Sequence, residues 1–204
     1  MALEIRNKTR AAIGAAATVA AVAAGAITLN ATGADAATPC SDVEVIAARG
    51  TGEPGRLGTI VGDPFARAVT QELSGEQVTS YAVDYPANWL LNYRAGSQDI
   101  IEHTTEQSSA CPDQEFVLVG YSQGAMATQS ALRSLPDDVD AKVRAVVLFG
   151  NPFLRSPLPA EYQDRTLNIC ANGDPFCDGG FNMLAHLSYT SDVGEAADFV
   201  ASQS

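Results

Sequence analysis

Five short apolar runs alternate along the chain with longer stretches that have the apolar periodicity of a helix. Most of the runs are rich in Val, Ile and Leu and lack a clean polar–apolar alternation, which is typical of strands covered on both faces. We predict strands at residues 43–48, 78–83, 116–119, 145–149 and 166–169, and helices at 65–73, 94–109, 125–135 and 195–202. This alternation strongly constrains the fold, because strands joined by helices form parallel sheets through right-handed crossovers.

The predicted fold is therefore α/β, a three-layer α/β/α sandwich around a central, mostly parallel, five-stranded sheet. The chain has 204 residues, of which 46% are hydrophobic, and this is enough for one substantial core. We expect one domain over residues 37–204, after a leader segment.

Residues 1–36 have the features of a signal peptide that is removed on export. Three basic residues near the start precede an uncharged stretch at 11–29, and a small-x-small cleavage pattern follows at 34–36. The alternative is a transmembrane anchor, which we disfavour because Ala and Gly dominate the stretch and bury little apolar area. We therefore expect a secreted, extracellular protein.

The formal net charge of −12 at pH 7 argues against nucleic acid as a partner. A surface of that sign repels phosphate backbones and anionic lipid headgroups instead of collecting their counterions. We expect no nucleic-acid partner and no stable membrane insertion, with a monomer as the default state.

Four cysteines follow the predicted cleavage point, and an even number in an exported protein predicts two disulfides. Of the possible pairings we favour Cys170 with Cys177, which are neighbours in the sequence, and this leaves Cys40 with Cys111. A metal site is the weaker alternative, because no cysteine pair has the spacing of a zinc knuckle and no histidine completes one.

In parallel sheets, functional residues gather in loops at the carboxyl ends of the strands. One such loop, GYSQG at 120–124, fits the pattern Gly-x-Ser-x-Gly and lies between a predicted strand and a predicted helix. This context predicts a nucleophile elbow, a sharp turn on which Ser122 is the nucleophile. The alternative is an ordinary serine in a glycine-flanked turn.

A serine hydroxyl needs a base to take its proton, and the chain contains two histidines. His186 follows Ser122 in the chain order that this elbow uses, so we predict that His186 is the base. His103 precedes Ser122 within a predicted helix, and we interpret it as a solvated residue on the helix face.

Asp174 is the predicted acid that orients the base, because it directly follows the fifth predicted strand. The other candidates, which cluster in a polar turn, are Asp137, Asp138 and Asp140. A bridge between Cys170 and Cys177 would hold the Asp174 loop in place, and with it the orientation of His186. The alternative is that Asp174 and Pro175 only form a turn.

Negative charge that develops on a substrate oxygen needs preorganised donors. We nominate the backbone N–H of Gln123, at the positive end of the helix after the elbow, and Thr51, whose N–H and hydroxyl could both point inward. Thr51 lies in the loop ARGTGEPG after the first strand, which could alternatively be a plain Gly-Pro turn.

Large apolar residues occur in two loops near this predicted site. They suggest a groove for acyl chains, although any single one could instead pack in the core. The residues are Trp89, Leu90, Leu91, Phe181, Met183, Leu184 and Leu187. The segment 151–165 between the last two strands is too short for a helical cap, so we expect a lidless site.

These features resemble the cutinase family of small secreted serine esterases. The resemblance rests on ARGTGEPG, GYSQG, the Cys-x3-Asp-x2-Cys loop CANGDPFC, the histidine in AHLSY and the positions of the other two cysteines, and it covers nearly all of residues 40–204. It implies a lidless α/β hydrolase with the disulfides paired as above. The site residues that it implies are Ser122, Asp174 and His186 for the catalytic triad, and Thr51 and Gln123 for the oxyanion hole.

The function implied by the resemblance is hydrolysis of carboxylic esters through an acyl-enzyme intermediate, without a cofactor. The expected substrates are cutin-type polyesters, short-chain acyl esters or lipids. One departure is Thr51, where fungal members commonly have serine. Two alternatives stay open: an acetylxylan esterase of the same fold, and a secreted binding protein without catalysis.

Overall fold

A parallel sheet of five strands lies at the centre of the computed structural model, which describes residues 40–203. The strands are β1 (Val43–Ala48), β2 (Val78–Ala82), β3 (Glu115–Tyr121), β4 (Val143–Phe149) and β5 (Thr166–Ile169). They lie in the order β2-β1-β3-β4-β5, and all pairings are parallel. The carboxyl ends of the strands therefore lie at one end of the sheet. The predicted signal peptide, residues 1–36, lies outside the described residues.

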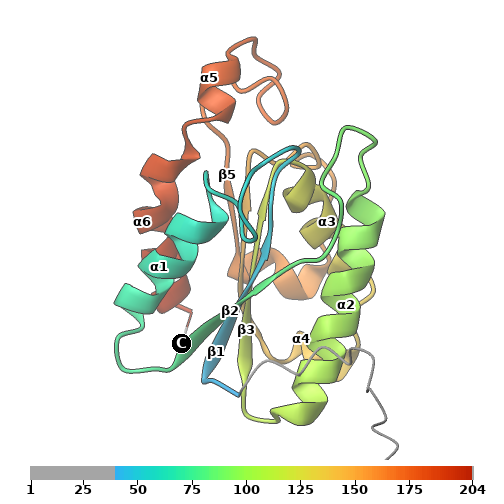
Figure 1. Cartoon of the computed structure of the whole chain (residues 1–204), viewed down its shortest axis with the longest axis vertical. Helices are drawn as coiled ribbons and strands as arrows, with labels where there is room; N and C mark the ends of the chain where they lie inside the picture. Colours follow the sequence, from blue (N-terminus) through green and yellow to red (C-terminus); the bar gives the residue numbers. More distant parts are fainter. Residues whose placement is uncertain (1–39, 204) are drawn as a thin grey trace, which may run out of the picture. The chain divides into compact units, whose positions relative to one another are not determined.

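Helices cover both faces of this sheet (Figure 1). On one face α1 (Gly62–Glu72) packs against α6 (Val193–Ala201), and on the other face α2 (Tyr93–Ala110) packs against α3 (Gln123–Ala131). The short helical elements are α4 (Asp137–Asp140), η1 (Ala160–Arg165), α5 (Met183–His186) and η2 (Tyr189–Asp192). The predicted three-layer α/β/α sandwich is confirmed.

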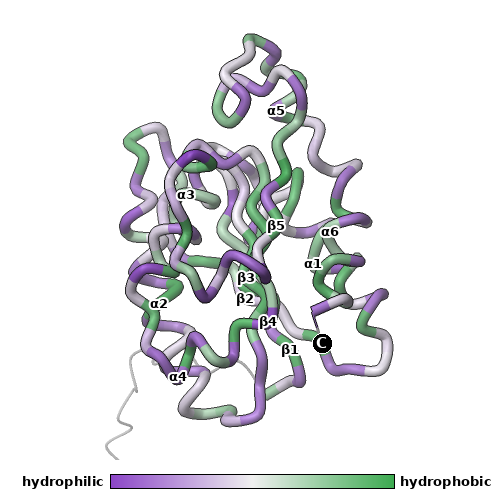
Figure 2. Tube along the Cα trace, turned by 180° about the vertical axis from the view of Figure 1, so that it is seen from behind, coloured by the Kyte–Doolittle hydropathy of each residue, from purple (hydrophilic) through white to green (hydrophobic). Residues whose placement is uncertain are grey.

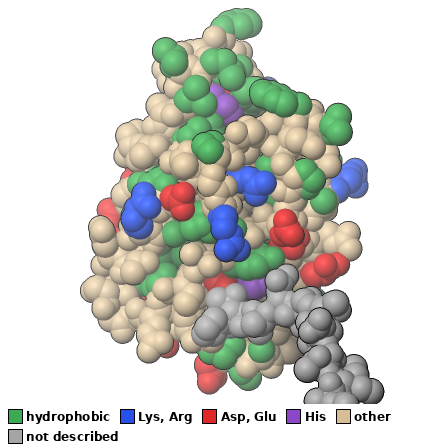
Figure 3. All heavy atoms as spheres, viewed as in Figure 1, with side chains coloured by type: hydrophobic (Ala, Val, Ile, Leu, Met, Phe, Trp, Pro, Cys, Tyr) green, Lys and Arg blue, Asp and Glu red, His purple; other side chains and the backbone are tan. Residues whose placement is uncertain are grey.

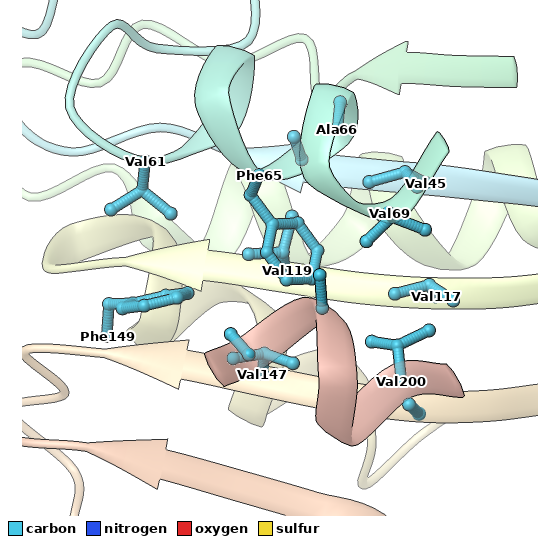
Figure 4. Close-up of a cluster of buried hydrophobic side chains, with 14 of the residues drawn as sticks. Val45, Val61, Phe65, Ala66, Val69, Val117, Val119, Val147, Phe149 and Val200 are labelled. Carbon is cyan, nitrogen blue, oxygen red and sulfur yellow. The ribbon is translucent and has the colours of Figure 1, made fainter. Parts of the chain in front are cut away.

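Each face of the sheet has its own apolar core. Along β1, Val45 packs in the core beneath α1 and α6, whereas Ile46 packs in the core beneath α2 and α3. Figure 4 shows the first core, where valines of three strands meet Phe65 of α1 and Val200 of α6. The hydropathy colours of Figure 2 accordingly run hydrophobic along parts of the strands and hydrophilic in many of the loops. In the three inner strands, β1, β3 and β4, both faces are buried, so successive residues are mostly apolar and show no regular alternation.

The predicted bounds agree with the structure within a few residues for the strands and for most of the long helices. The largest difference is α3, which begins at Gln123 and ends at Ala131, where residues 125–135 were expected. The elbow leads directly into the helix with Gly124 in its first turn, and a glycine there resembles a loop in the sequence. The four short helical elements were not predicted, because one turn is too short to establish a helical period.

The interpretation of His103 as a solvated residue is wrong. His103 lies on α2, but its side chain is only 12% exposed, and its Nε2 lies 2.9 Å from Oε2 of Glu44, a fully buried carboxylate on β1. Its ring also stacks on that of Tyr81, with 3.5 Å between the centroids. A buried carboxylate needs a partner, and the sheet-facing side of α2 supplies it.

The two disulfides join Cys40 to Cys111 and Cys170 to Cys177, as favoured from the sequence. The first joins Cys40, three residues before β1, to Cys111, directly after α2, at the amino ends of the strands. The second closes the loop after β5, at their carboxyl ends. Among the helices within residues 40–203, none is both long and apolar enough to cross a membrane.

Candidate active site

Ser122 lies on a sharp turn between β3 and α3, and its backbone is strained. Its φ of 55° and ψ of −116° fall in a region that residues other than glycine rarely adopt. The N–H of Ser122 donates to the carbonyl of Phe149 on β4 at 2.9 Å, and its carbonyl accepts from the N–H of Met126 on α3 at 3.2 Å. The strand, the turn and the helix give the structural context that the Gly-x-Ser-x-Gly motif requires.

The two glycines of the motif allow β3, α3 and β1 to approach closely. A Cβ on Gly120 would lie 2.6 Å from the carbonyl oxygen of Gly124, within the turn itself. A Cβ on Gly124 would lie 1.8 Å from the carbonyl oxygen of Ala48 at the end of β1. Both contacts involve backbone atoms, so only glycine fits at these positions.

Ser122, His186 and Asp174 form a chain of hydrogen bonds although they lie far apart in the sequence. Nε2 of His186 lies 3.0 Å from Oγ of Ser122, and Nδ1 lies 2.7 Å from Oδ2 of Asp174. All three residues are buried: Ser122 is 8% exposed, His186 is 4% exposed and Asp174 is 0% exposed. A carboxylate can only accept, so Nδ1 carries the hydrogen and Nε2 is left to accept from the serine hydroxyl.

The carboxylate of Asp174 accepts three hydrogen bonds. Its Oδ1 accepts from the N–H of Phe176 at 2.7 Å, and its Oδ2 accepts from the Tyr189 hydroxyl at 2.5 Å as well as from His186. Burial alone raises the pKa of Asp174, but the hydrogen bonds from Tyr189, His186 and Phe176 outweigh it and hold this pKa below its ordinary value. Asp174 is therefore ionised at neutral pH although it is fully buried.

The Cys170–Cys177 disulfide closes the loop that carries Asp174. Within the loop, the N–H of Asp174 donates to the carbonyl of Ala171 at 3.0 Å, and the carbonyl of Asp174 accepts from the N–H of Asp178 at 3.1 Å. The acid is thus held by a covalent bridge and by its own turn, as the sequence pattern suggested.

Thr51 and Gln123 contact each other beside Ser122. With the Gln123 carboxamide turned so that both of its ends meet complementary partners, Nε2 donates to Oγ1 of Thr51 at 3.2 Å. Its Oε1 then accepts from the N–H groups of Asn92 at 2.7 Å and Leu91 at 3.3 Å. The Thr51 hydroxyl is an acceptor toward Gln123, so its own hydrogen is free to point toward a ligand. The N–H of Gln123 is the first of α3, where helix N–H groups have no intrahelical partner.

A buried carboxylate that the sequence analysis did not single out holds the Thr51 loop. Oε2 of Glu53 accepts from the N–H of Gly50 at 2.7 Å, and Oε1 accepts from the N–H of Ile60 at 2.6 Å. Burial raises the pKa of Glu53 despite the backbone N–H groups that lower it. A Cβ on Gly50 would lie 2.7 Å from the ring of Tyr121, so this loop reaches β3 only with glycine at that position.

A cavity of about 480 Å³ opens beside Ser122 and His186, and most of its lining is apolar. The apolar lining residues are Pro54, Ile60, Trp89, Leu91, Met126, Pro152, Phe176, Met183 and Leu187. Thr51 and Gln123 also line it. Within residues 40–203, no group of His, Cys, Asp and Glu side chains is arranged to hold a metal ion.

The predicted substrate-binding residues fall into two groups. Trp89, Met183 and Leu187 line the cavity together with Leu91. The residues that do not line it are Leu90, Phe181 and Leu184, which are 82%, 101% and 75% exposed. Nearness in sequence to the site did not determine side-chain direction, because neighbouring residues of a loop or of a single helical turn face different ways.

Besides Glu53, three further contacts of the site were missed by the sequence analysis. Phe176 lies against the His186 ring with 4.5 Å between centroids, and Tyr121 donates its hydroxyl to the carbonyl of His186 at 2.6 Å. In the third contact, the hydroxyl of Tyr189 donates to Oδ2 of Asp174. Tyr121 is part of GYSQG and Tyr189 follows His186 by three residues, so both could have been noted as neighbours, but no sequence pattern shows where a hydroxyl points.

Comparison with known proteins identifies the family of this chain. The family model described as Cutinase matches residues 39–204. A cutinase of Botryotinia fuckeliana is 44% identical over 174 residues, which cover 83% of this chain and 86% of the relative. Phospholipase Culp4 of Mycobacterium tuberculosis is 39% identical over 185 residues, which cover 82% of this chain and 81% of the relative.

Among solved structures, that of the Trichoderma reesei cutinase in complex with a C11Y4 phosphonate inhibitor matches with a TM-score of 0.74 and 34% identity. The match covers 82% of this chain and 78% of that one. The family model, the relatives and the common fold lead to one conclusion. The chain belongs to the cutinase family and is a cutinase-like ester hydrolase.

Proposed function

We propose that this protein is a secreted serine esterase that hydrolyses carboxylic esters through an acyl-enzyme intermediate. The proposal rests on the line of hydrogen bonds from Ser122 through His186 to Asp174, with 3.0 Å and 2.7 Å between the bonded atoms. This line lies beside an apolar cavity. A nucleophile, a base and an orienting acid in this geometry can carry out acyl transfer.

In the acylation step, Oγ of Ser122 attacks the ester carbonyl carbon while Nε2 of His186 takes the hydroxyl proton. The ionised Asp174 stabilises the imidazolium that forms. The proton then passes from Nε2 to the leaving oxygen, so the alcohol departs and the acyl group stays on Ser122. Water, activated by the same nitrogen, attacks the acyl-enzyme and releases the carboxylic acid.

The carbonyl oxygen becomes negative in both steps, and Thr51 and Gln123 supply the donors that stabilise it. The N–H of Gln123 points from the positive end of α3, and the Thr51 hydroxyl has a free hydrogen. The Gln123 side chain is bound to Thr51 and to the backbone at Asn92, so these donors are fixed before substrate arrives. Such preorganised donors need little rearrangement during the reaction.

The surroundings of the site favour esters with apolar chains. The exposed large apolar residues are Trp89, Leu90, Leu91, Phe176, Phe181, Met183, Leu184 and Leu187. Figure 3 shows hydrophobic side chains gathered at the end of the protein that carries α5. An apolar cavity with an apolar rim supports water-insoluble substrates such as cutin-type polyesters and lipids, as well as short-chain acyl esters.

Secretion is part of the proposal. The signal-peptide pattern in residues 1–36 supports export, and so do two disulfides, because such bonds persist in oxidising compartments.

Labelling with a fluorophosphonate tests the catalytic part of this proposal. We expect one adduct on Ser122 in the wild type and none in Ser122→Ala, with loss of hydrolysis of p-nitrophenyl butyrate in the variant. An unlabelled Ser122 in folded wild-type protein would favour a binding protein and refute the esterase.

The substrate class is tested with p-nitrophenyl acetate, butyrate and hexanoate. Trp89→Ala should reduce kcat/KM for hexanoate more than for acetate, because Trp89 lines the cavity. Leu90→Ala is the matched control, since this neighbour is as exposed as Trp89 and does not line the cavity. A wild-type preference for acetate, with hydrolysis of acetylated xylan, would instead favour the acetylxylan esterase.

A further inference from the structure

We infer that the hydroxyl of Tyr189 is a positioning group of the active site, which holds the Asp174 carboxylate and sets how strongly His186 binds a proton. The inference rests on the proposed serine mechanism and assigns a role to a residue outside the triad. Tyr189 begins η2, three residues after His186, and its side chain is fully buried.

The hydrogen bonds of the Tyr189 hydroxyl determine where its hydrogen points. The hydroxyl oxygen accepts from the N–H of Ala171 at 3.1 Å, which leaves one hydrogen to donate. Oδ2 of Asp174 lies 2.5 Å away, and Sγ of Cys177 lies 3.5 Å away. A carboxylate accepts far more strongly than a sulfur atom does, so the hydrogen points to Asp174.

The same carboxylate oxygen receives Nδ1 of His186 at 2.7 Å. Oδ2 therefore accepts from two donors, His186 and Tyr189, and the Tyr189 side chain is packed in the protein core. The Tyr189 ring makes edge contacts with Tyr121 and Phe149, with centroids 5.8 Å and 5.9 Å away. Through this hydroxyl, the packed core fixes the direction in which Asp174 faces the imidazole.

Other titratable groups near Asp174 and His186 do not hold the Asp174 carboxylate. Within residues 40–203 these are Tyr121, Glu53 and Asp178. Tyr121 donates to the carbonyl of His186, Glu53 binds the Thr51 loop, and Asp178 is exposed and accepts from a backbone N–H at 2.8 Å. Burial raises the pKa of Tyr121 and of Tyr189, so both are protonated donors at neutral pH.

Loss of the Tyr189 hydroxyl should act on His186 through Asp174. With one donor fewer, the carboxylate is more basic, and it holds the imidazolium more strongly. The base must be neutral to take the serine proton, so the acid limb of the pH profile should move to higher pH. The carboxylate is also freer to rotate, which should lower kcat without changing substrate binding.

The test compares pH profiles of kcat/KM for p-nitrophenyl butyrate in the wild type, Tyr189→Phe and Tyr162→Phe. Tyr162 is the matched control, because it is also fully buried and its hydroxyl donates to a carboxylate, Asp140 of α4. Figure 1 shows α4 at the opposite end of the sheet from α5. We expect Tyr189→Phe to raise the acid limb by about 0.5–1 pH unit and to lower kcat about tenfold at constant KM.

Tyr162→Phe should lower the melting temperature and leave the acid limb in place. Should Tyr189→Phe not fold, 3-fluorotyrosine incorporated at position 189 keeps the ring and strengthens the donor, and the acid limb should then move to lower pH. An acid limb at the wild-type position in a folded variant altered at position 189 overturns the inference. Fluorophosphonate labelling of wild-type Ser122 distinguishes that outcome from failure of the proposed function.

Discussion

Removal of the Cys170–Cys177 disulfide should cost less stability than removal of Cys40–Cys111, but much more activity. The two bonds close loops of very different length, with sequence separations of 7 and 71 residues. They also lie at opposite ends of the parallel strands. The double variants C170S/C177S and C40S/C111S therefore separate what a bridge does for folding from what it does for the site.

The stability effects follow from loop closure in the unfolded chain. The entropy that a bridge removes gives about 2.5 kcal/mol for the short loop and about 4.4 kcal/mol for the long loop at 25 °C. For a domain of this size, these free energies lower the melting temperature by roughly 5–10 °C and roughly 9–18 °C. C40S/C111S should therefore be the less stable variant.

The activity effects should have the opposite order. The short bridge brackets Asp174, and Sγ of Cys177 lies 3.5 Å from the Tyr189 hydroxyl that binds this acid. A displacement of about 1 Å can cost two orders of magnitude in rate, so we expect C170S/C177S to lower kcat by about 10- to 100-fold. C40S/C111S alters only the amino ends of the strands, so we expect kcat within about twofold of the wild type where this variant is folded.

The assay is urea unfolding followed by far-ultraviolet circular dichroism, combined with kcat for p-nitrophenyl butyrate at 25 °C. Tryptophan fluorescence is unsuitable, because the single tryptophan, Trp89, is 82% exposed. Full kcat in folded C170S/C177S, or an equal loss of kcat in both variants, would refute the positioning role of the short bridge.

Two further predictions concern Asp174 and the elbow glycine. The pKa of Asp174 is lowered in the folded state, so its carboxylate stabilises the fold above about pH 4, and this contribution is lost as the pH falls through the lowered pKa. In the wild type, the free energy of unfolding should therefore fall as the pH drops below about 4, and in Asp174→Asn it should fall less steeply. Urea titrations at several pH values measure this dependence, and the same dependence on pH in both proteins would contradict the prediction. Gly124→Ala should abolish folding or lower the melting temperature strongly, because its Cβ would lie 1.8 Å from the carbonyl oxygen of Ala48. Gly75→Ala, whose Cβ would meet no atom within 4 Å in the described part of the chain, is the control, and equal melting of both variants would show that α3 can move away from β1.

The sequence predicted the architecture well because local patterns carry it. A strand buried on both faces is a nearly uninterrupted apolar run, so the bounds of β1, in which every residue is buried, could be obtained directly. The elbow was predictable for a related reason. The close approach of α3 to β1 and β3 leaves no room for a Cβ at Gly120 or Gly124, and these glycines are visible in the sequence.

Side-chain direction was not predictable from local patterns. Leu90 and Leu91 are adjacent in one loop, yet only Leu91 lines the cavity. The backbone of Leu91 has a φ of 52°, a left-handed conformation that the sequence does not reveal for a leucine. The hydroxyl of Tyr189 and the carboxylate of Glu53 meet their partners only when the chain is folded. Their contribution to the site could therefore be recognised only in the three-dimensional structure.

The two histidines show what a histidine–carboxylate pair can and cannot indicate. Both lie on helices and both bind a fully buried carboxylate, with 2.9 Å from Nε2 of His103 to Glu44 and 2.7 Å from Nδ1 of His186 to Asp174. Only at His186 does the second ring nitrogen meet a serine hydroxyl, on a strained turn beside a cavity. A buried pair of this kind is therefore not evidence of a catalytic base by itself. The chain order after the elbow distinguished the two residues in the sequence, and the position of the other ring nitrogen gives the physical reason in the structure.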